Sequence, residues 1–130
     1  MDYKHNEKFY IVEFKPHIDD RGKLLPFEYN KNCPFDVKRI FLIYDVPNRE
    51  IIRGEHVNEK SKTLIVAVSG SVMIDCYDEQ GNKQTFNLNN KAQGLYISNG
   101  VYRKLYNFEK ETVLLCLSDC YYDSMEYISE

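Results

Sequence analysis

Several features that would assign a function directly are scarce in this sequence. The 130 residues contain no tryptophan and only three histidines. No apolar run approaches the roughly 20 residues that span a bilayer. Lysine and arginine number 17 against 20 aspartates and glutamates, so the formal net charge of −3 gives no basic excess for nucleic acid. The first ten residues lack the apolar core of a secretion signal. We therefore expect a cytoplasmic protein that binds neither nucleic acid nor membrane.

The four cysteines also lack the pairwise spacing of metal or redox motifs. Cys33, Cys76, Cys116 and Cys120 never form a C-x-x-C pair, and a chain of this length does not depend on disulfide bonds for stability. We expect them to be reduced and mostly structural. No Ser-His-Asp order, phosphate-binding glycine loop or paired carboxylates stand out, which removes the commonest hydrolase and nucleotide-hydrolysis signatures.

Short β-rich segments separated by turn signals make up most of the chain. About ten strands at this close spacing predict a single all-β domain over residues 1–130, a cupin-like jelly roll rather than an α/β fold. No segment shows a convincing 3.6-residue apolar period, although residues 124–129 are compatible with one helical turn. We expect strands over residues 10–14, 24–29, 38–46, 64–68, 71–78, 83–88, 94–98, 101–108, 112–118 and 121–128.

One stretch, residues 53–70, organises the candidate site. Its sequence RGEHVNEKSKTLIVAVSG places His56 and Asn58 two residues apart, so on a strand both side chains project from the same face and line a pocket. The spacing of Gly54, His56, Asn58, Thr63 and Gly70 resembles the first cupin motif. Asparagine and threonine stand at two of that motif's metal-binding positions, and neither side chain is a good ligand for a divalent metal. We therefore expect no metal.

His56 is the candidate base, because the ordinary pKa of histidine suits proton transfer near neutral pH. The alternative is a hydrogen-bonded structural histidine. Three arginines lie among apolar strand residues, where a guanidinium is costly unless it meets an anion. Surface ion pairing is the alternative for any one of them, but Arg39, Arg53 and Arg103 together indicate a phosphate-bearing ligand.

Tyrosine is abundant, with eleven residues, and most of these rings should pack in the core or pair across strands. Tyr44, Tyr96 and Tyr102 are kept as candidates for the pocket. The amide of Asn58 can donate to or accept from a bound oxygen, and its alternative role is a turn amide at the end of a strand.

Longer segments carry a family resemblance over nearly the whole chain. DDRGKLLPFE, CPFDVKRIFLIYDVP, IIRGEHVNEK and GLYISNGVYRKLYNF resemble the 3,4-ketoisomerases of dTDP-4-keto-6-deoxyglucose, a cupin family. The resemblance implies a homodimeric jelly roll that exchanges N-terminal strands and uses no metal or other cofactor. It also implies an isomerase that converts a dTDP-linked 4-keto sugar into its 3-keto isomer, for deoxysugar synthesis in glycans or antibiotics.

The same resemblance implies roles for individual residues. His56 corresponds to the base, Arg39 and Arg53 to the residues that hold the nucleotide diphosphate, Arg103 to a residue of the sugar pocket, and Arg21 to a residue near the sugar. Three positions depart from the family: Asn58 replaces a second histidine, Thr63 a glutamine and Tyr102 a tryptophan.

The expected mechanism moves one proton between neighbouring carbons. His56 removes it from C3 and returns it to C4, Asn58 hydrogen-bonds the enediolate oxygens, and Tyr44 or Tyr102 relays the hydroxyl proton. Two alternatives stay open at this point. The first is a non-catalytic protein that binds nucleotide sugars, suggested by the missing second histidine. The second is a keto-sugar epimerase that uses the same base chemistry.

The N-terminal strand supplies the prediction about assembly. Residues 10–14, YIVEF, are apolar enough to need a partner, and the turn at residues 19–22 lets the chain return after crossing to a second subunit. We therefore expect these residues to complete the sheet of the partner.

Overall fold

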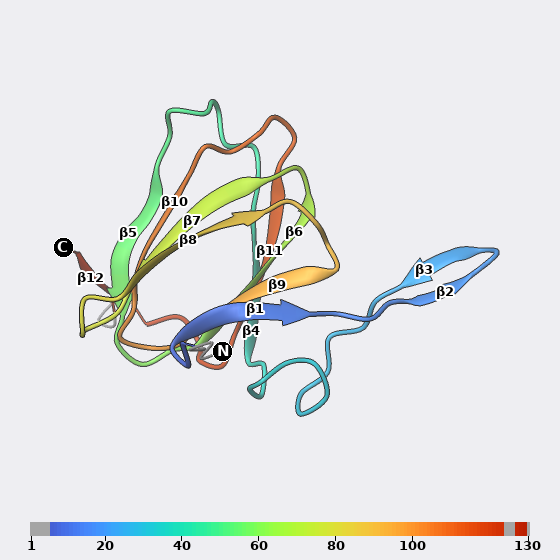
Figure 1. Ribbon diagram of the computed structural model, residues 1–130, viewed down its shortest axis with the longest axis horizontal. Helices are drawn as coiled ribbons and strands as arrows, with labels where there is room; N and C mark the ends of the chain where they lie inside the picture. Colours follow the sequence, from blue (N-terminus) through green and yellow to red (C-terminus); the bar gives the residue numbers. More distant parts are fainter. Residues whose placement is uncertain (1–5, 124–126, 130) are drawn as a thin grey trace, which may run out of the picture.

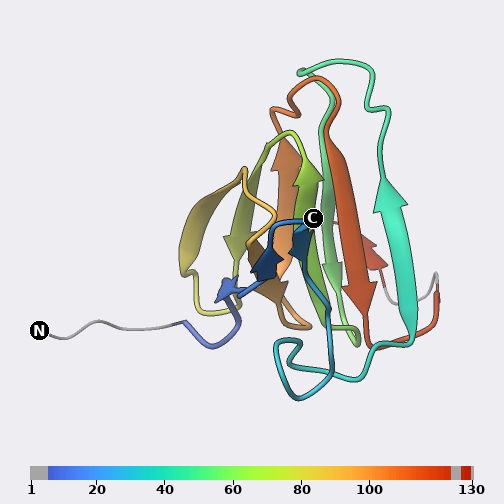
Figure 2. The ribbon, with the colours of Figure 1, turned by 90° about the vertical axis from the view of Figure 1, so that its right-hand side faces the viewer.

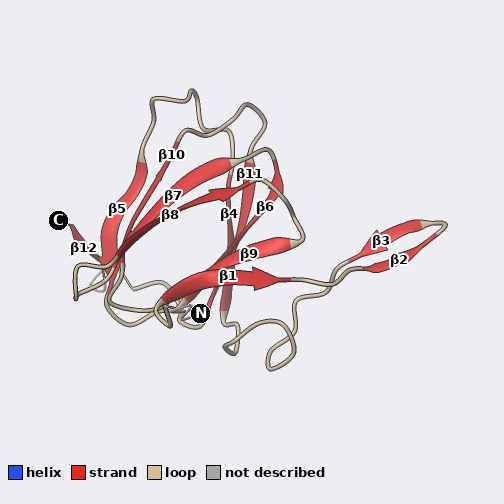
Figure 3. Ribbon diagram, in the orientation of Figure 1, coloured by secondary structure: helices blue, strands red, loops and turns tan. Residues whose placement is uncertain are grey.

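Strands account for all the regular secondary structure in the described part of the chain. The computed structural model describes residues 6–123 and 127–129, in which twelve strands and no helix are found (Figure 3). The expected all-β class is confirmed. No helix long and apolar enough to cross a membrane is found in these residues.

Two five-stranded antiparallel sheets pack face to face (Figures 1 and 2). In the first sheet the order is β1, β9, β6, β11, β4; in the second it is β12, β5, β10, β7, β8. The first sheet consists of β1 (Phe9–Glu13), β9 (Gln93–Ile97), β6 (Thr63–Ser69), β11 (Val113–Ser118) and β4 (Arg39–Ile43). The second consists of β12 (Tyr127–Ser129), β5 (Arg53–Asn58), β10 (Tyr102–Tyr106), β7 (Val72–Tyr77) and β8 (Lys83–Leu88). The arrangement is the predicted cupin-like jelly roll.

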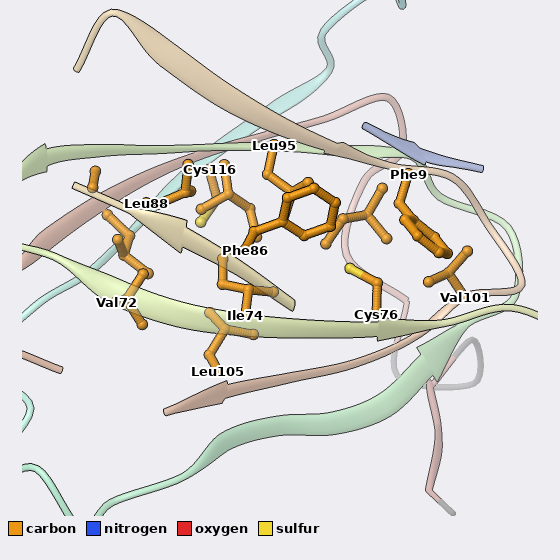
Figure 4. Packing of buried hydrophobic residues seen from close by; sticks show 14 of the residues in the cluster. Phe9, Val72, Ile74, Cys76, Phe86, Leu88, Leu95, Val101, Leu105 and Cys116 are labelled. Carbon is orange, nitrogen blue, oxygen red and sulfur yellow. The ribbon is translucent and has the colours of Figure 1, made fainter. Parts of the chain in front are cut away.

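The main core lies between the sheets. Phe86 and Ile74 from the second sheet meet Leu95 and Cys116 from the first (Figure 4). Phe9 packs edge-on against Phe86, with ring centroids 6.1 Å apart. This packing holds the sheets at a fixed separation and so fixes the width of any cavity between them.

A second apolar cluster covers the outer face of the first sheet. Phe35 and Leu25, from the segment before β4, pack with Leu64 and Val66 of β6. Because β6 is buried on both faces, its sequence reads as a continuous apolar run rather than an alternating one. The two clusters together therefore make β6 the centre of the molecule.

A third pair of strands, β2 (His17–Asp19) and β3 (Gly22–Leu24), forms a hairpin that projects away from both sheets (Figure 1). The predicted turn at residues 19–22 is present, but the expected strand at 24–29 does not pair with residues 10–14. Instead β1 pairs with β9 of its own chain, Phe9 opposite Ile97. The segment that extends from the body is thus the hairpin and not the first strand.

Two other predictions can be compared with the structure. The strands expected over residues 71–78 and 83–88 are confirmed as β7 and β8, which pair as a hairpin with Val72 opposite Leu88. The possible helical turn at 124–129 is wrong where it can be compared, since residues 127–129 form strand β12 beside β5. Residues 124–126 lie outside the described part of the chain.

Candidate functional site

A cavity of about 350 Å³ lies between the two sheets, and each sheet contributes a different kind of side chain to its wall. The first sheet contributes a mainly apolar wall through β4, β6 and β11. The second contributes the charged and hydrogen-bonding groups through β5 and β10. The residues that line it are Phe41, Ile43, Arg53, Gly54, His56, Asn58, Thr63, Ile65, Arg103, Leu105 and Cys116. The predicted pairing of His56 and Asn58 on one pocket face is confirmed.

A β-bulge in β5 brings Arg53 to the same cavity. Regular alternation would place Arg53 and His56, three residues apart, on opposite faces of the strand. The register against β10 skips Glu55, because Arg103 faces His56 while Lys104 faces Gly54. Gly54 and Glu55 both have positive φ, 82° and 58°. Such a bulge inserts one unpaired residue and turns the strand, so Arg53 and His56 both reach the cavity.

The backbone around the bulge also orients the candidate base. His56 Nδ1 lies 3.1 Å from the carbonyl oxygen of Gly54. A carbonyl can only accept a hydrogen bond, so the neutral imidazole carries its proton on Nδ1 and donates it to Gly54. The tautomer leaves Nε2 as the nitrogen that can take up a proton. A base oriented in this way suits repeated proton transfer.

Positive charge is concentrated on this cavity. Arg103 is only 4% exposed and lies directly across β5–β10 from His56. Its Nη2 donates to the carbonyl oxygen of Val101 at 3.3 Å. Arg39 lies beside the cavity, with its guanidinium 4.9 Å from the centre of the Phe41 ring. Three of the four arginines implied by the family resemblance therefore converge, with Arg53 and Arg103 on the wall and Arg39 next to it.

The charges of all three guanidinium groups affect the pKa of the Cys116 thiol. Burial raises the pKa of Cys116 to about 12, and the positive charges of Arg103, Arg53 and Arg39 oppose that rise. The four cysteines are thiols rather than disulfides. At neutral pH Cys116 is thus a neutral, weakly polar part of the cavity wall.

None of the described residues on the cavity wall is an aspartate or a glutamate. A wall that carries guanidinium groups and no carboxylate among its described residues favours an anionic ligand. The described residues contain no group of three or more histidine, cysteine, aspartate or glutamate side chains placed to hold a metal ion. The wall itself offers one imidazole, one amide and one hydroxyl as its nitrogen and oxygen donors besides the arginines.

Asn58 is buried at the end of β5, with 5% of its surface exposed. Its Nδ2 donates to the hydroxyl oxygen of Ser61 at 3.1 Å. Its Oδ1 is buried without a hydrogen-bond partner. The residue is therefore a cavity amide rather than an exposed turn amide.

The structure separates the predicted tyrosines from the cavity. Tyr44 follows β4 and is 60% exposed, while the inward side chains of that strand are Phe41 and Ile43. Tyr102 precedes Arg103 on β10 and points to the other face, where its ring meets Tyr77 edge-on at 5.6 Å. Tyr96 packs in the outer cluster of the first sheet. Within one chain, neither Tyr44 nor Tyr102 can relay a proton in the cavity.

Arg21 also lies outside the cavity of its own chain. It sits at the tip of the β2–β3 hairpin, where its side chain is 87% exposed and forms an ion pair of 2.8 Å with Asp19. The expectation that Arg21 approaches the sugar therefore fails within a single chain.

Sequence reasoning missed the apolar half of the site. Phe41, Ile43, Ile65 and Leu105 line the cavity, but in the sequence they are indistinguishable from core residues. The one available signal was the alternation of β4, in which Arg39, Phe41 and Ile43 share a face.

Known proteins are similar to this chain in sequence over most of its length. The FdtA family model, described as WxcM-like, C-terminal, matches residues 7–130. TDP-4-oxo-6-deoxy-alpha-D-glucose-3,4-oxoisomerase from Aneurinibacillus thermoaerophilus is 34% identical over 120 residues, covering 92% of this chain and 85% of that protein.

Solved structures agree with this similarity. The TDP-fucose-3,4-ketoisomerase WlaRA from Campylobacter jejuni is 40% identical, with a TM-score of 0.88 over 94% of this chain and 89% of its own. A histidine-to-asparagine variant of the 3,4-ketoisomerase QdtA from Thermoanaerobacterium thermosaccharolyticum was solved in complex with TDP-4-keto-6-deoxyglucose. It is 32% identical, with a TM-score of 0.88 over 97% of this chain and 90% of its own.

Proposed function

Because this chain belongs to the FdtA family, we propose that it is a sugar-nucleotide 3,4-ketoisomerase of deoxysugar biosynthesis. Its substrate is a TDP-linked 4-keto-6-deoxy sugar and its product the 3-keto isomer. The observation that carries the proposal is the cavity in which His56 lies directly across from Arg103, with two further arginines close by. One oriented base and a cluster of cations are what an isomerisation on a diphosphate-linked sugar needs.

The chemistry is an internal redox exchange between two carbons. His56 Nε2 removes the proton from C3, and the C3–H electron pair forms the C3=C4 double bond while the C4 carbonyl becomes an enediolate oxygen. The proton of the C3 hydroxyl then passes to the C4 oxygen, which becomes the new hydroxyl, while the C3 oxygen becomes the new carbonyl and the C3=C4 electron pair takes the proton back from the imidazolium at C4. Atoms and electrons balance without an external oxidant, so the proposed reaction consumes no cofactor.

Arg53, Arg103 and Arg39 have separate parts in this proposal. Guanidinium groups bind phosphate oxygens through charge-assisted hydrogen bonds, and the enediolate also develops negative charge. Arg103 is the arginine that faces His56, so we assign it to the charge that forms on the sugar. Arg39 and Arg53 are assigned to the diphosphate.

Product analysis tests the reaction. The purified protein is incubated with TDP-4-keto-6-deoxyglucose, and NMR follows the sugar carbons. We expect the C4 carbonyl signal to be replaced by a C3 carbonyl signal. Calorimetry with TDP covers the competing hypothesis, since tight binding without any product would indicate a non-catalytic binding protein. Return of a 4-keto sugar with an inverted centre would indicate the epimerase.

We also propose that the protein is a homodimer in which the β2–β3 hairpin is exchanged. β4 is an edge strand of the first sheet, and its outward residues Ile40, Leu42 and Tyr44 are each more than half exposed. The hairpin likewise exposes Ile18 and Leu24. Pairing of the hairpin of one copy along β4 of the other covers both apolar surfaces and removes an open edge. A charge at Leu42, as in Leu42→Asp, should give monomers by light scattering.

This exchange gives Arg21 a place at the site. The inward face of β4 lines the cavity through Phe41 and Ile43, so a hairpin on that edge brings its tip close to the cavity of the partner. Complementation tests this arrangement. Arg21→Ala and His56→Asn, each impaired alone, are co-expressed with two tags and the mixed dimer is purified. One site of that dimer has both residues, so about half of the native activity should return. A mixed dimer no more active than its parents would place Arg21 outside the partner's site.

The cytoplasmic location remains a prediction, as does the use of the product in glycan or antibiotic sugar synthesis.

A further inference from the structure

The orientation of the Asn58 amide assigns it a role different from the one expected at the outset. Its Nδ2 is committed to Ser61 Oγ at 3.1 Å, and Ser61 itself is fully buried. Its Oδ1 is buried, has no hydrogen-bond partner and belongs to a side chain that lines the cavity. A carbonyl oxygen can only accept a hydrogen bond. Asn58 therefore holds an unpaired acceptor at the wall of the cavity.

We propose that Asn58 selects the substrate by accepting a hydrogen bond from a hydroxyl group of the sugar, and that Ser61 is the positioning residue that holds the amide in this orientation. This inference rests on the proposed function. An enediolate oxygen carries negative charge and needs a donor, so it cannot be the partner of Oδ1. The partner must be a group that still holds its proton, and the hydroxyls of a sugar are such groups.

A buried acceptor without a partner makes the site selective. An occupant that lacks a donor at this position leaves Oδ1 desolvated and unpaired, whereas a sugar hydroxyl satisfies it. The cavity should therefore distinguish TDP-4-keto-6-deoxyglucose from TDP alone partly through this one contact. The expected contribution is about fivefold in affinity, typical of a neutral hydrogen bond.

Calorimetry in the His56→Asn background, where the sugar is not turned over, tests the selection. The readout is the ratio of the TDP dissociation constant to that of TDP-4-keto-6-deoxyglucose, because effects on the diphosphate cancel in it. Asn58→Leu, which is similar in size but has no acceptor, should lower the ratio about fivefold. Asn58→Asp keeps the acceptor and should keep the ratio. Ser61→Ala releases the amide and should lower the ratio in part, while Ser69→Ala, at the end of β6 away from the cavity residue Thr63, should leave it unchanged.

Kinetics with His56 intact separates acceptor from donor. An acceptor that binds an unreacting hydroxyl contributes equally to ground state and transition state, so the uncharged variant Asn58→Leu should raise KM about fivefold and keep kcat within about tenfold. A donor to the enediolate would instead make Asn58→Leu lose roughly a hundredfold or more in kcat. That loss, or an unchanged ratio in both Asn58→Leu and Ser61→Ala, would overturn the inference and leave the ketoisomerase proposal standing. Equal affinities for TDP and TDP-sugar before any change at Asn58 would also overturn the inference alone, because product formation tests the ketoisomerase separately.

Discussion

Gly54 is the position where a single methyl group should disturb both stability and activity. Its φ is +82°, and a Cβ placed there would lie 3.1 Å from the carbonyl oxygen of Arg103 and 3.2 Å from Leu105 Cδ1. The left-handed backbone costs an L-residue roughly 1–2 kcal/mol. The contact with Arg103 involves backbone that is hydrogen-bonded in the β5–β10 ladder, and such overpacking adds about 1–3 kcal/mol. Gly54→Ala should therefore destabilise the protein by about 2–5 kcal/mol.

Gly81 provides the matched control. Its φ is +85°, close to that of Gly54, but nothing lies within 4 Å of the position its Cβ would take. Gly81→Ala should thus show only the backbone cost, roughly 1–2 kcal/mol. The difference between the two variants isolates the steric crowding at the bulge.

Urea unfolding and the rate of ketoisomerisation are the two assays. Gly54 also accepts the hydrogen bond of His56 Nδ1, so a shifted bulge should reorient the base and lower kcat. Gly81→Ala, in a remote hairpin turn, should keep the native rate. Equal destabilisation by the two substitutions, together with an unchanged kcat for Gly54→Ala, would refute the argument that the bulge positions His56.

Three further outcomes follow from the site and the core. Arg103→Met should weaken TDP-sugar binding roughly 10- to 100-fold, because charge-assisted hydrogen bonds are lost. It should not lower the melting temperature, because a buried cation is replaced by an apolar chain. An affinity within twofold of native would contradict this. Tyr102→Phe should keep kcat/KM within about twofold, since the ring lies on the other face of β10; a larger loss would return Tyr102 to the mechanism. Burial raises the pKa of Cys76 and Cys116 from 9.0 to about 12, so between pH 9 and pH 12 only the folded state keeps the thiol protons, and the free energy of unfolding falls as pH rises by about 1.4 kcal/mol per pH unit for each thiol. Cys76→Ala should make the slope of the free energy of unfolding in urea against pH shallower by that amount. An unchanged slope would contradict this.

The sequence was sufficient where strand periodicity decides the answer. His56 and Asn58 are two residues apart, and the structure places both on the cavity wall. Arg103 was expected to be costly inside the protein without an anion, and it is indeed buried. In both cases a local pattern and an elementary cost determine which way the side chain points.

Alternation groups Arg39, Phe41 and Ile43 on one face of β4, but it does not say which face points inward, because both faces are apolar. Phe41 and Ile43 point into the cavity, while Leu42 and Tyr44 point outward, and the sequence gives no reason to prefer one set. In the homodimer proposed above another copy covers this edge, and such cover is a property of the assembly rather than of the single strand.

The β-bulge in β5 could not be predicted from the sequence for a different reason. Glu55 is an ordinary charged residue, and only its positive φ and its missing partner on β10 identify it as the inserted position. Tyr102 and Arg103 were both expected to line the pocket, but neighbours on a strand point to opposite faces and cannot both line one cavity. Within the single chain the first strand pairs with β9, and its exchange between two copies stays a prediction.

The most direct test of the account is solvent exchange catalysed by His56. TDP-4-keto-6-deoxyglucose is incubated in deuterated water with the native protein or with His56→Asn, and NMR records deuterium at C3 of the recovered substrate and C4 of the product. Calorimetry first establishes that both proteins bind TDP. The native protein should incorporate deuterium at both carbons, and His56→Asn should bind TDP equally well yet incorporate none. Exchange at the native rate in His56→Asn would show that another residue is the base and would contradict the mechanism.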